Sequence, residues 1–354
     1  MAEQGTNREN MELSEEERLK QLAAQIRAAQ YQGLSEEEIQ EKERQQELRR
    51  KANIAILEHS LSILDQGCYE KTGRNVRLNF SGKQMREVQV FLPDDIDALQ
   101  TEADGCLFAE NKEDQTRNTS CTFGCENIDA LAFAQKKYYY LKEEGASAPR
   151  ILVLNLASAT HPGGHTREGA SAQEEDLCRR TSLLLSLESE DAKRYYEYNN
   201  ERKSRMGSDG VILSPNVEVI KDTSAETLSE PFPISVMSCA APMVRLGLEG
   251  MSQQEYETML YKRIRGMLLV AASQNFRHLV LGAFGCGVYG NDAAVVSDLF
   301  HYVIQDFSYG GKDSSRLFDS IDFAVLCGAD NDYNYRQFCR NFSPDGENLV
   351  KKFR

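Results

Sequence analysis

Hydrophobic residues form two kinds of pattern along this chain. Short continuous apolar runs, typical of strands that are buried on both faces by helices, occur at residues 150–156, 211–213, 234–239, 279–283 and 323–327. Between several of these runs, apolar residues recur at helical spacing, at about 174–187, 252–274 and 291–306. Strands that alternate with helices predict a layered α/β domain with a mainly parallel or mixed sheet.

The first part of the chain has a different pattern. Residues 1–50 are rich in Glu, Gln, Lys, Arg and Ala, and capping boxes predict two helix starts, at Ser14 with Glu17 and at Ser35 with Glu38. Gly33 is a helix stop. The remaining predictions are a helix over 50–66 that ends at Gly67, strands at 76–79 and 87–92, a looser region at 93–125 and a helix at about 127–144.

We therefore expect two parts: a helical extension over residues 1–50 and one domain over 51–354, with its core at about 120–342. The extension is either a solvated accessory arm or a helix that binds a partner.

Composition narrows the class of protein. No apolar run reaches the roughly 18–20 residues of a membrane span, and the polar N-terminus lacks the apolar segment of a secretory signal. The nine cysteines are scattered, which favours reduced thiols and a cytoplasmic location. Cys121 and Cys125 lack a second pair to complete a zinc site. The net charge of −14 argues against direct nucleic-acid binding.

The loop after the run at 150–156 carries candidate chemistry. Pro162-Gly163-Gly164 is a turn in which the backbone can approach a ligand closely. Gln173-Glu174-Glu175 then opens a helix, where the helix dipole favours acidic side chains. Taken alone, the two glutamates are explained as a stabilised helix start. His161 and His165 are spaced as a metal pair, but in a turn of this kind they need not share a face.

A second loop, after the run at 279–283, is rich in glycine. Gly282, Gly285, Gly287 and Gly290 free several amides to point at one anion, and the following helix adds its positive end. The loop also contains a Gly-x-Gly-x-x-Gly sequence, which is the fingerprint of a Rossmann nicotinamide site. That site needs an acidic residue about twenty positions further on, at the end of a second strand, and the run at 323–327 is too far away. A tight turn without a ligand is a further alternative.

The spaced combination of the first loop resembles the signature of the poly(ADP-ribose) glycohydrolases, a glycine triplet followed after a short spacer by Gln-Glu-Glu. Here Gly163-Gly164-His165 precedes Gln173-Glu174-Glu175 by seven residues, and Asp176-Leu-Cys-Arg-Arg180 is similar to the microbial branch. The resemblance extends from about Arg50 to Phe342 and includes Gly67-Cys68-Tyr69 and a strand end at Ser214-Pro215. It implies a macrodomain-like three-layer α/β fold, with a mixed central sheet flanked by helices, after the N-terminal helical extension.

The resemblance also implies a function, the hydrolysis of the ribosyl O-glycosidic bond in ADP-ribose polymers or ADP-ribosylated proteins. Neighbouring glutamates on a helix diverge by about 100°, so one should do chemistry while the other holds the substrate. The family assigns the acid to Glu175 and ribose binding to Glu174. Neither a metal nor a cofactor is implied, and the partner is ADP-ribose or poly(ADP-ribose) on modified proteins.

Further site residues follow from the resemblance. Asn155 is expected to bind a ribose hydroxyl, and residues 240–242 line the pocket. Tyr289 occupies the place of an aromatic that packs on the distal ribose, and Glu126 or Asp129 contacts the adenine. The other substrate-binding candidates are Gly163, Gly164, His165, Gln173, Gly282, Ala283, Phe284, Gly285, Cys286, Gly287, Val288, Gly290 and Asn291.

One departure from the signature leaves the substrate open. The third glycine is His165, which can crowd the ribose next to the scissile bond, contact a different leaving group, or point outward. The alternatives to a polymer-cleaving enzyme are therefore a non-catalytic ADP-ribose reader and a hydrolase restricted to mono-ADP-ribosyl substrates.

Overall fold

The structure is a computed structural model that describes residues 31–105, 120–328 and 331–343. The chain divides into two units, residues 1–48 and 49–354. In the first unit, Gly33 has a φ of +81° just after a helix that ends at Tyr31. The capping box at Ser35 and Glu38 is confirmed, since the Ser35 amide donates to Glu38 Oε2 at 2.8 Å. The predicted start at Ser14 and Glu17 lies outside the described residues.

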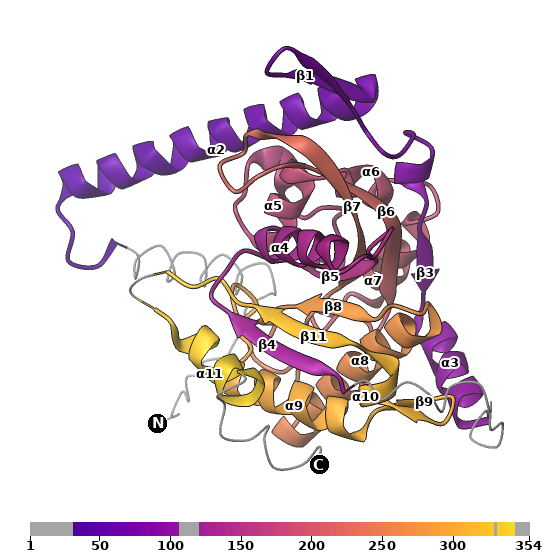
Figure 1. The fold of residues 1–354 in the computed structure, drawn as a ribbon. Helices are drawn as coiled ribbons and strands as arrows, with labels where there is room; N and C mark the ends of the chain where they lie inside the picture. The colour runs from indigo at the N-terminus through magenta and orange to yellow at the C-terminus, as the bar shows by residue number, and fades with distance from the viewer. Residues whose placement is uncertain (1–30, 106–119, 329–330, 344–354) are drawn as a thin grey trace, which may run out of the picture. The chain divides into compact units, whose positions relative to one another are not determined.

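Seven strands form one mixed sheet in the order β3-β6-β7-β5-β8-β11-β4 (Figure 1). Strands β7, β5, β8, β11 and β4 are parallel, and β6 is antiparallel to both β3 and β7. The strands are β3 (Gln89–Phe91), β4 (Thr122–Glu126), β5 (Ile151–Leu156), β6 (Val211–Lys221), β7 (Thr227–Cys239), β8 (His278–Leu281) and β11 (Ser320–Ala324). Two small hairpins lie outside the sheet, β1 (Cys68–Lys71) with β2 (Arg74–Arg77) and β9 (Ser308–Tyr309) with β10 (Lys312–Asp313).

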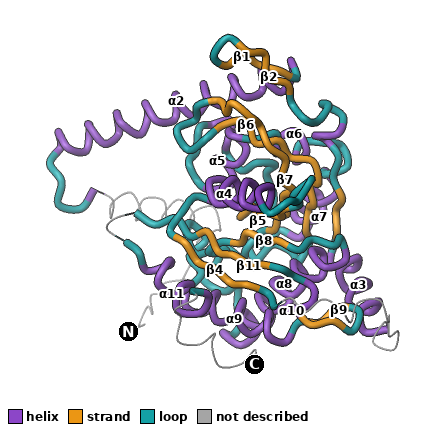
Figure 2. Tube along the Cα trace, in the orientation of Figure 1, coloured by secondary structure: helices purple, strands orange, loops and turns teal. Residues whose placement is uncertain are grey.

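Helices cover both faces of this sheet, as Figure 2 shows in the same orientation. The helices of the described residues are α2 (Glu36–Gln66), α3 (Pro93–Gly105), α4 (Ala130–Glu143), α5 (Gln173–Arg180), α6 (Leu183–Leu187), α7 (Lys193–Arg202), α8 (Gln253–Ser273), α9 (Ala293–Asp306), α10 (Ser314–Leu317) and α11 (Tyr333–Phe342).

Alternate side chains of β5 enter different cores, because successive side chains of a strand point to opposite faces. Leu152 and Leu154 pack with residues of α8, α9 and α11. Ile151 and Val153 pack with residues of α4, α5, α6 and α7. The expected three-layer, macrodomain-like α/β fold with a mixed central sheet is confirmed.

Several element predictions were wrong in detail. The region at 93–125 contains a helix, α3, with Pro93 in its first turn, and a strand, β4. Strand β6 does not end at Ser214-Pro215 but continues to Lys221, through a register shift between Ser214 and Val217. Proline has no amide hydrogen to donate to a neighbouring strand. The bulge at this register shift lets β6 continue beyond Pro215 without that hydrogen bond.

The helix predicted over 174–187 is two helices. Thr181 leaves the helical conformation and forms a bridge with Val219 of β6, while the Ser182 amide donates to the Glu218 carbonyl at 3.0 Å. Pairing with the sheet therefore ends α5 at Arg180.

Candidate active site

The candidate site lies where three neighbouring parallel strands end. Strand β5 pairs with β7 on one side and with β8 on the other. The loops that follow these strands therefore meet at one edge of the sheet, which is where ligands bind in open α/β sheets. Both loops singled out in the sequence are among them (Figure 1).

Gln173 attaches the first turn of α5 to the end of β5. Its Oε1 accepts from the Leu156 amide at 2.8 Å, and its Nε2 donates to the Leu154 carbonyl at 2.8 Å. The Gln173 side-chain amide thus makes the same pair of hydrogen bonds with β5 that the backbone of a neighbouring strand would make. Its hydrogen bonds set the position of the two glutamates that follow.

Glu174 is buried, and both of its carboxyl oxygens have partners. Oε1 accepts from Asn155 Nδ2 at 3.1 Å and Oε2 accepts from the Ser158 amide at 2.7 Å. Asn155 Nδ2 also donates to Ser238 Oγ, while Asn155 Oδ1 is buried and has no partner within the described part of the chain. Burial raises the pKa of Glu174 to about 8, against the opposing effect of its hydrogen bonds.

Glu175 has a different environment from its neighbour. Its Oε1 accepts from the His165 amide at 3.0 Å. Its Oε2 is buried and, among the residues that the structure describes, has no hydrogen-bond partner. The side chain is 7% exposed. Glu175 therefore presents one fixed oxygen and one available oxygen.

The glycine turn leaves no room for side chains beside these carboxyls. Gly163 and Gly164 have φ values of +68° and +60°. A Cβ on Gly164 would lie 2.5 Å from Glu175 Oε1, and one on Gly163 would lie 2.7 Å from Leu184 Cδ1. Both positions therefore require glycine for conformation and for space.

His165, at the third position of the triplet, needs no such freedom. Its φ is −106°, which any residue adopts. Its side chain is 65% exposed, and Nδ1 lies 3.8 Å from Glu168 Oε2. The ring centroid is 5.4 Å from that of His161, whose Nδ1 lies 2.9 Å from Thr160 Oγ1. The described residues contain no cluster of three or more side chains arranged to hold a metal ion.

Asn291 holds the glycine-rich second loop through hydrogen bonds from its own side chain. Its Nδ2 donates to the carbonyls of Pro242 and Gly285, at 2.8 and 2.9 Å, and its Oδ1 accepts from Tyr256 OH at 2.7 Å. A Cβ on Gly285 would lie 2.5 Å from Ala241 Cβ. The loop after β8 therefore packs directly on the segment after β7.

Two backbone carbonyls of this loop, those of Gly287 and Tyr289, also accept hydrogen bonds. The Gly287 carbonyl accepts from Arg245 Nη2 and from the Gly290 amide, and the Tyr289 carbonyl accepts from the amides of Val244 and Arg245. Within the described ranges, the amides of Gly287, Val288 and Tyr289 donate no hydrogen bond. Three unpaired amides in succession are the donors that an anion requires.

The helix after this loop contributes less positive potential than expected. Asp292 is its N-cap and accepts from the Ala294 amide at 2.8 Å. Its carboxylate also accepts from Tyr333 OH at 3.0 Å. A negative side chain thus occupies part of the positive end of α9, so the loop amides are the more available donors for an anion.

Tyr289 of the second loop is within electrostatic reach of the glutamate pair. Its pKa is raised to about 12, chiefly by burial and also by the carboxylates of Glu174 and Glu175, while an interaction with Ser158 opposes the rise. Of the other predicted residues of that loop, Phe284 is fully buried, Val288 is 71% exposed, and the Cys286 amide closes a turn on the Ala283 carbonyl. Gly282 follows β8 directly.

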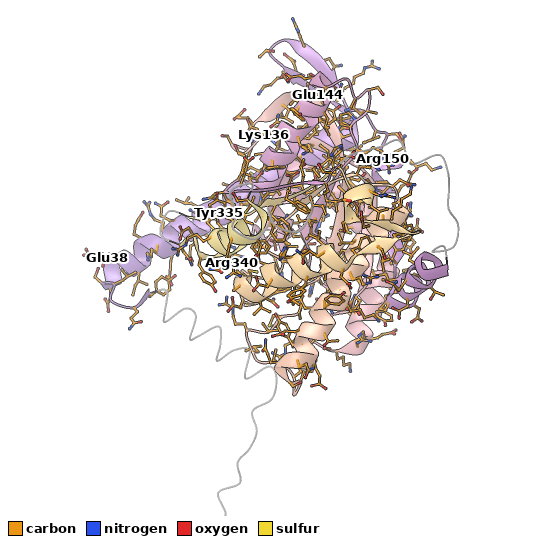
Figure 3. The ribbon with its side chains drawn as sticks, turned by 60° about the horizontal axis from the view of Figure 1, so that its bottom comes forward. Glu38, Lys136, Glu144, Arg150, Tyr335 and Arg340 are labelled. Carbon is orange, nitrogen blue, oxygen red and sulfur yellow. The ribbon has the colours of Figure 1, made fainter. Side chains whose placement is uncertain are left out.

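The two adenine candidates lie at the end of β4, away from these three strands. Glu126 accepts from Lys136 Nζ at 2.7 and 2.9 Å, and Lys136 is labelled on α4 in Figure 3. Asp129 caps α4 and forms an ion pair with Arg180 at 3.0 Å. Both carboxylates thus have structural partners.

Three residues that support the site have no short-range sequence signal. Ser158 and Ser238 fix Glu174 and Asn155 from two different strand ends. Asn53 of α2 donates to the Gly169 carbonyl at 2.9 Å and to Ser171 Oγ at 3.1 Å. These contacts join residues far apart in sequence, and only an internal repeat or covariation would reveal them.

Comparison with known proteins agrees with this geometry. The family model described as the microbial-type PARG catalytic domain matches residues 57–222. A poly(ADP-ribose) glycohydrolase structure from Thermomonospora curvata is 28% identical and covers 82% of this chain and 100% of its own, with a TM-score of 0.71. One from Deinococcus radiodurans, in complex with ADP-ribose, is 32% identical and covers 75% of this chain and 98% of its own, with a TM-score of 0.61. No curated protein matches the chain.

A mixed sheet flanked by helices, with its long loops at one edge and similar to these structures over most of the chain, defines a macrodomain-like α/β protein. With 32% identity over nearly the whole of the Deinococcus chain, the protein belongs to the microbial-type poly(ADP-ribose) glycohydrolase family. This assignment displaces the Rossmann nicotinamide alternative for the Gly285–Gly290 sequence.

Proposed function

We propose that this protein hydrolyses the ribosyl O-glycosidic bond of ADP-ribose polymers or ADP-ribosylated proteins and releases ADP-ribose. The observation that carries the proposal is the buried carboxyl of Glu175, which has one oxygen held by the His165 amide and one without a partner in the described residues. A general acid needs a fixed carboxyl with an oxygen free to reach the leaving group.

Glu174 suits a holding role better than an acid role. Both of its oxygens accept hydrogen bonds from the protein, from Asn155 and from the Ser158 amide. Its carboxyl and the Asn155 amide are the groups we assign to the ribose hydroxyls. Gly163 and Gly164 allow the sugar to approach the two carboxyls closely, because no side chain intervenes.

The reaction follows from these positions. Glu175 protonates the oxygen that departs from the anomeric carbon, and the C–O bond breaks to leave an oxocarbenium-like ribosyl cation. The diphosphate of the substrate is bound by the loop amides at 287–289 and stabilises this cation. Water then adds to the anomeric carbon and transfers a proton to the Glu175 carboxylate, which restores the acid. The products are ADP-ribose and the free hydroxyl of the leaving group.

ADP-ribose as the ligand is supported by the relatives. The Deinococcus radiodurans glycohydrolase was solved in complex with ADP-ribose, and the Thermomonospora curvata one with the inhibitor ADP-HPD. A non-catalytic reader would use the same loops without turnover. The unpartnered oxygen of Glu175 favours the enzyme, since binding alone requires no buried acid.

The test compares Glu175→Gln with Glu168→Gln, an exposed acid of the same loop. We expect Glu175→Gln to reduce ADP-ribose release from poly- and mono-ADP-ribosylated protein by at least about 100-fold and to keep ADP-ribose binding. Glu168→Gln should remain active. If the unmodified chain binds ADP-ribose but releases none from either substrate, the enzyme proposal is wrong and the protein is a non-catalytic ADP-ribose reader.

A further inference from the structure

The segment after β7 carries an arginine that is bonded to the glycine-rich second loop. Arg245 Nη2 donates to the Gly287 carbonyl at 2.9 Å, and the Arg245 backbone amide donates to the Tyr289 carbonyl at 3.0 Å. A Cβ on Gly290 would lie 3.1 Å from Arg245 Cβ, so the loop also packs on this residue. The side chain and the backbone of one residue therefore both contact the loop.

The segment that carries Arg245 is itself anchored on both sides of it. Before it, the Met243 amide donates to the Arg205 carbonyl at 3.0 Å. After it, Glu249 accepts from Ser204 Oγ at 2.7 Å and from Arg205 Nε at 3.1 Å. The position of Arg245 therefore does not depend on the second loop alone.

The contact with the Gly287 carbonyl lies opposite one of the free donors of the loop. The peptide bonds of the described residues are trans, and in a trans peptide the carbonyl and the N–H point in opposite directions. A guanidinium at the Gly287 carbonyl therefore leaves the Val288 amide pointing away from it. That amide, like those of Gly287 and Tyr289, donates no hydrogen bond within the described ranges. A cation at the carbonyl polarises the peptide and makes the N–H a stronger donor.

The second loop has no positive side chain of its own. Residues 282–291 contain no lysine or arginine, and Asp292 occupies part of the positive end of α9. Arg245 is exposed, and among the described residues no carboxylate lies within ion-pair distance of it. In a chain with a net charge of −14, its charge is thus available to an anion bound at the loop.

We propose that Arg245 is a positioning residue of the second loop, which orients the free amides at 287–289 and adds positive charge for the diphosphate of ADP-ribose. This inference rests on the proposed function, in which the loop binds that diphosphate. The described hydrogen bonds of Arg245 go to the loop and not to Glu174 or Glu175. Its effect therefore falls on the affinity for the ligand.

Three variants separate the hydrogen bond from the charge: Arg245→Lys keeps both, Arg245→Gln keeps a donor without the charge, and Arg245→Ala removes both. We expect the Kd for ADP-ribose at low salt to rise about tenfold in Arg245→Ala and about threefold in Arg245→Gln, and to stay within about twofold in Arg245→Lys. The Kd should depend less on salt concentration in Arg245→Gln than in the unmodified chain. The control Arg74→Ala removes the same charge from an exposed position of β2, outside the central sheet, and should change neither quantity.

An Arg245→Ala variant that binds ADP-ribose as tightly as the unmodified chain would overturn the inference and leave the proposed function intact. An equal rise of the Kd in all three variants, with unchanged salt dependence, would also overturn it, because Arg245 would then only support the shape of the loop. If the unmodified chain binds ADP-ribose but releases none from either substrate, the proposed function fails separately, and the same Kd values still decide the inference.

Discussion

The two adjacent glutamates Glu174 and Glu175 have different hydrogen-bond environments. Successive side chains of a helix diverge by about 100°, so Glu174 bonds to residues at and just after the end of β5, while Glu175 bonds to the glycine turn. Asn155 and the Ser158 amide bind both oxygens of Glu174. Only one oxygen of Glu175 is bound, by the His165 amide, within the part of the chain described.

Burial of Glu174 predicts a pH dependence of stability. Its pKa rises from 4.5 to about 8 on folding, so between these values the folded state binds more protons than the unfolded state. The stability that this proton contributes is fully present below pH 4.5 and is lost as the pH rises towards 8. The loss is on the order of 1 kcal/mol per pH unit.

Glu174→Gln should remove this slope and make the free energy of unfolding less dependent on pH. Denaturant titrations at pH 5, 7 and 9 would measure it, with Glu168→Gln as the exposed control. The same slope in Glu174→Gln and in the unmodified chain would show that Glu174 is ionised in the folded protein at neutral pH.

At the scale of elements, the C-terminal part of α2 supports the first loop, between β5 and α5. Ser60 Oγ donates to the Arg179 carbonyl at 2.6 Å, at the end of α5. Asn53 reaches the carbonyls of Gly169 and Ala170. Gly169 has a φ of +78°, and a Cβ there would lie 2.4 Å from the Arg50 carbonyl. This stretch of helix therefore braces the loop that carries His165 and precedes Glu175.

Asn53→Ala should weaken catalysis more than it weakens the fold. It removes the side-chain bonds to residues 169–171 and no buried apolar contact. We expect a loss of about 1 kcal/mol in stability and a severalfold fall in the rate of ADP-ribose release. Glu58→Ala, at an exposed position of the same helix, is the control. Equal rates in the two variants would mean that the loop keeps its shape without Asn53.

At the scale of the whole domain, a buried arginine joins segments that lie far apart in sequence. Arg263 of α8 is 1% exposed. Its Nη1 donates to the carbonyls of Met206 and Ala240, both at 2.8 Å, and its Nε donates to Asp209 Oδ1 at 3.1 Å. It thereby fixes the start of the segment after β7, on which the glycine-rich loop after β8 packs.

Arg263→Leu should destabilise the domain by about 3–5 kcal/mol, because it leaves a largely buried carboxylate and two carbonyls without their donor. Arg336→Leu is the matched control, since Arg336 pairs with Asp332 and both side chains are more than half exposed; it should cost less than about 1 kcal/mol. Thermal and denaturant unfolding would compare them. A small loss in Arg263→Leu would indicate that water enters and replaces the guanidinium.

The α11 helix shows why some elements escaped prediction. Phe338 and Phe342 are fully buried, and the Phe342 ring stacks on Phe323 of β11 with centroids 4.1 Å apart. Arg340, labelled in Figure 3, binds Asp298 of α9. These contacts hold a helix of only ten residues, a length at which a helical period in the sequence is weak evidence. Helix α7, with Tyr195 and Tyr196, escaped for the same reason, whereas α3 had a readable start in Pro93 and its acidic first turn.

The sequence by itself determined the α/β class, the central strands, the two loops and the family, because hydrophobic period and short motifs are local properties of a chain. Only the tertiary structure decided what each site residue contacts. It showed that Gln173 and Asn291 bind the protein's own backbone, that His165 is exposed, and that Asn53 supports the loop. The physical reason is that hydrogen bonds and burial at the sheet edge join residues far apart in sequence, and no local pattern encodes which of them will meet.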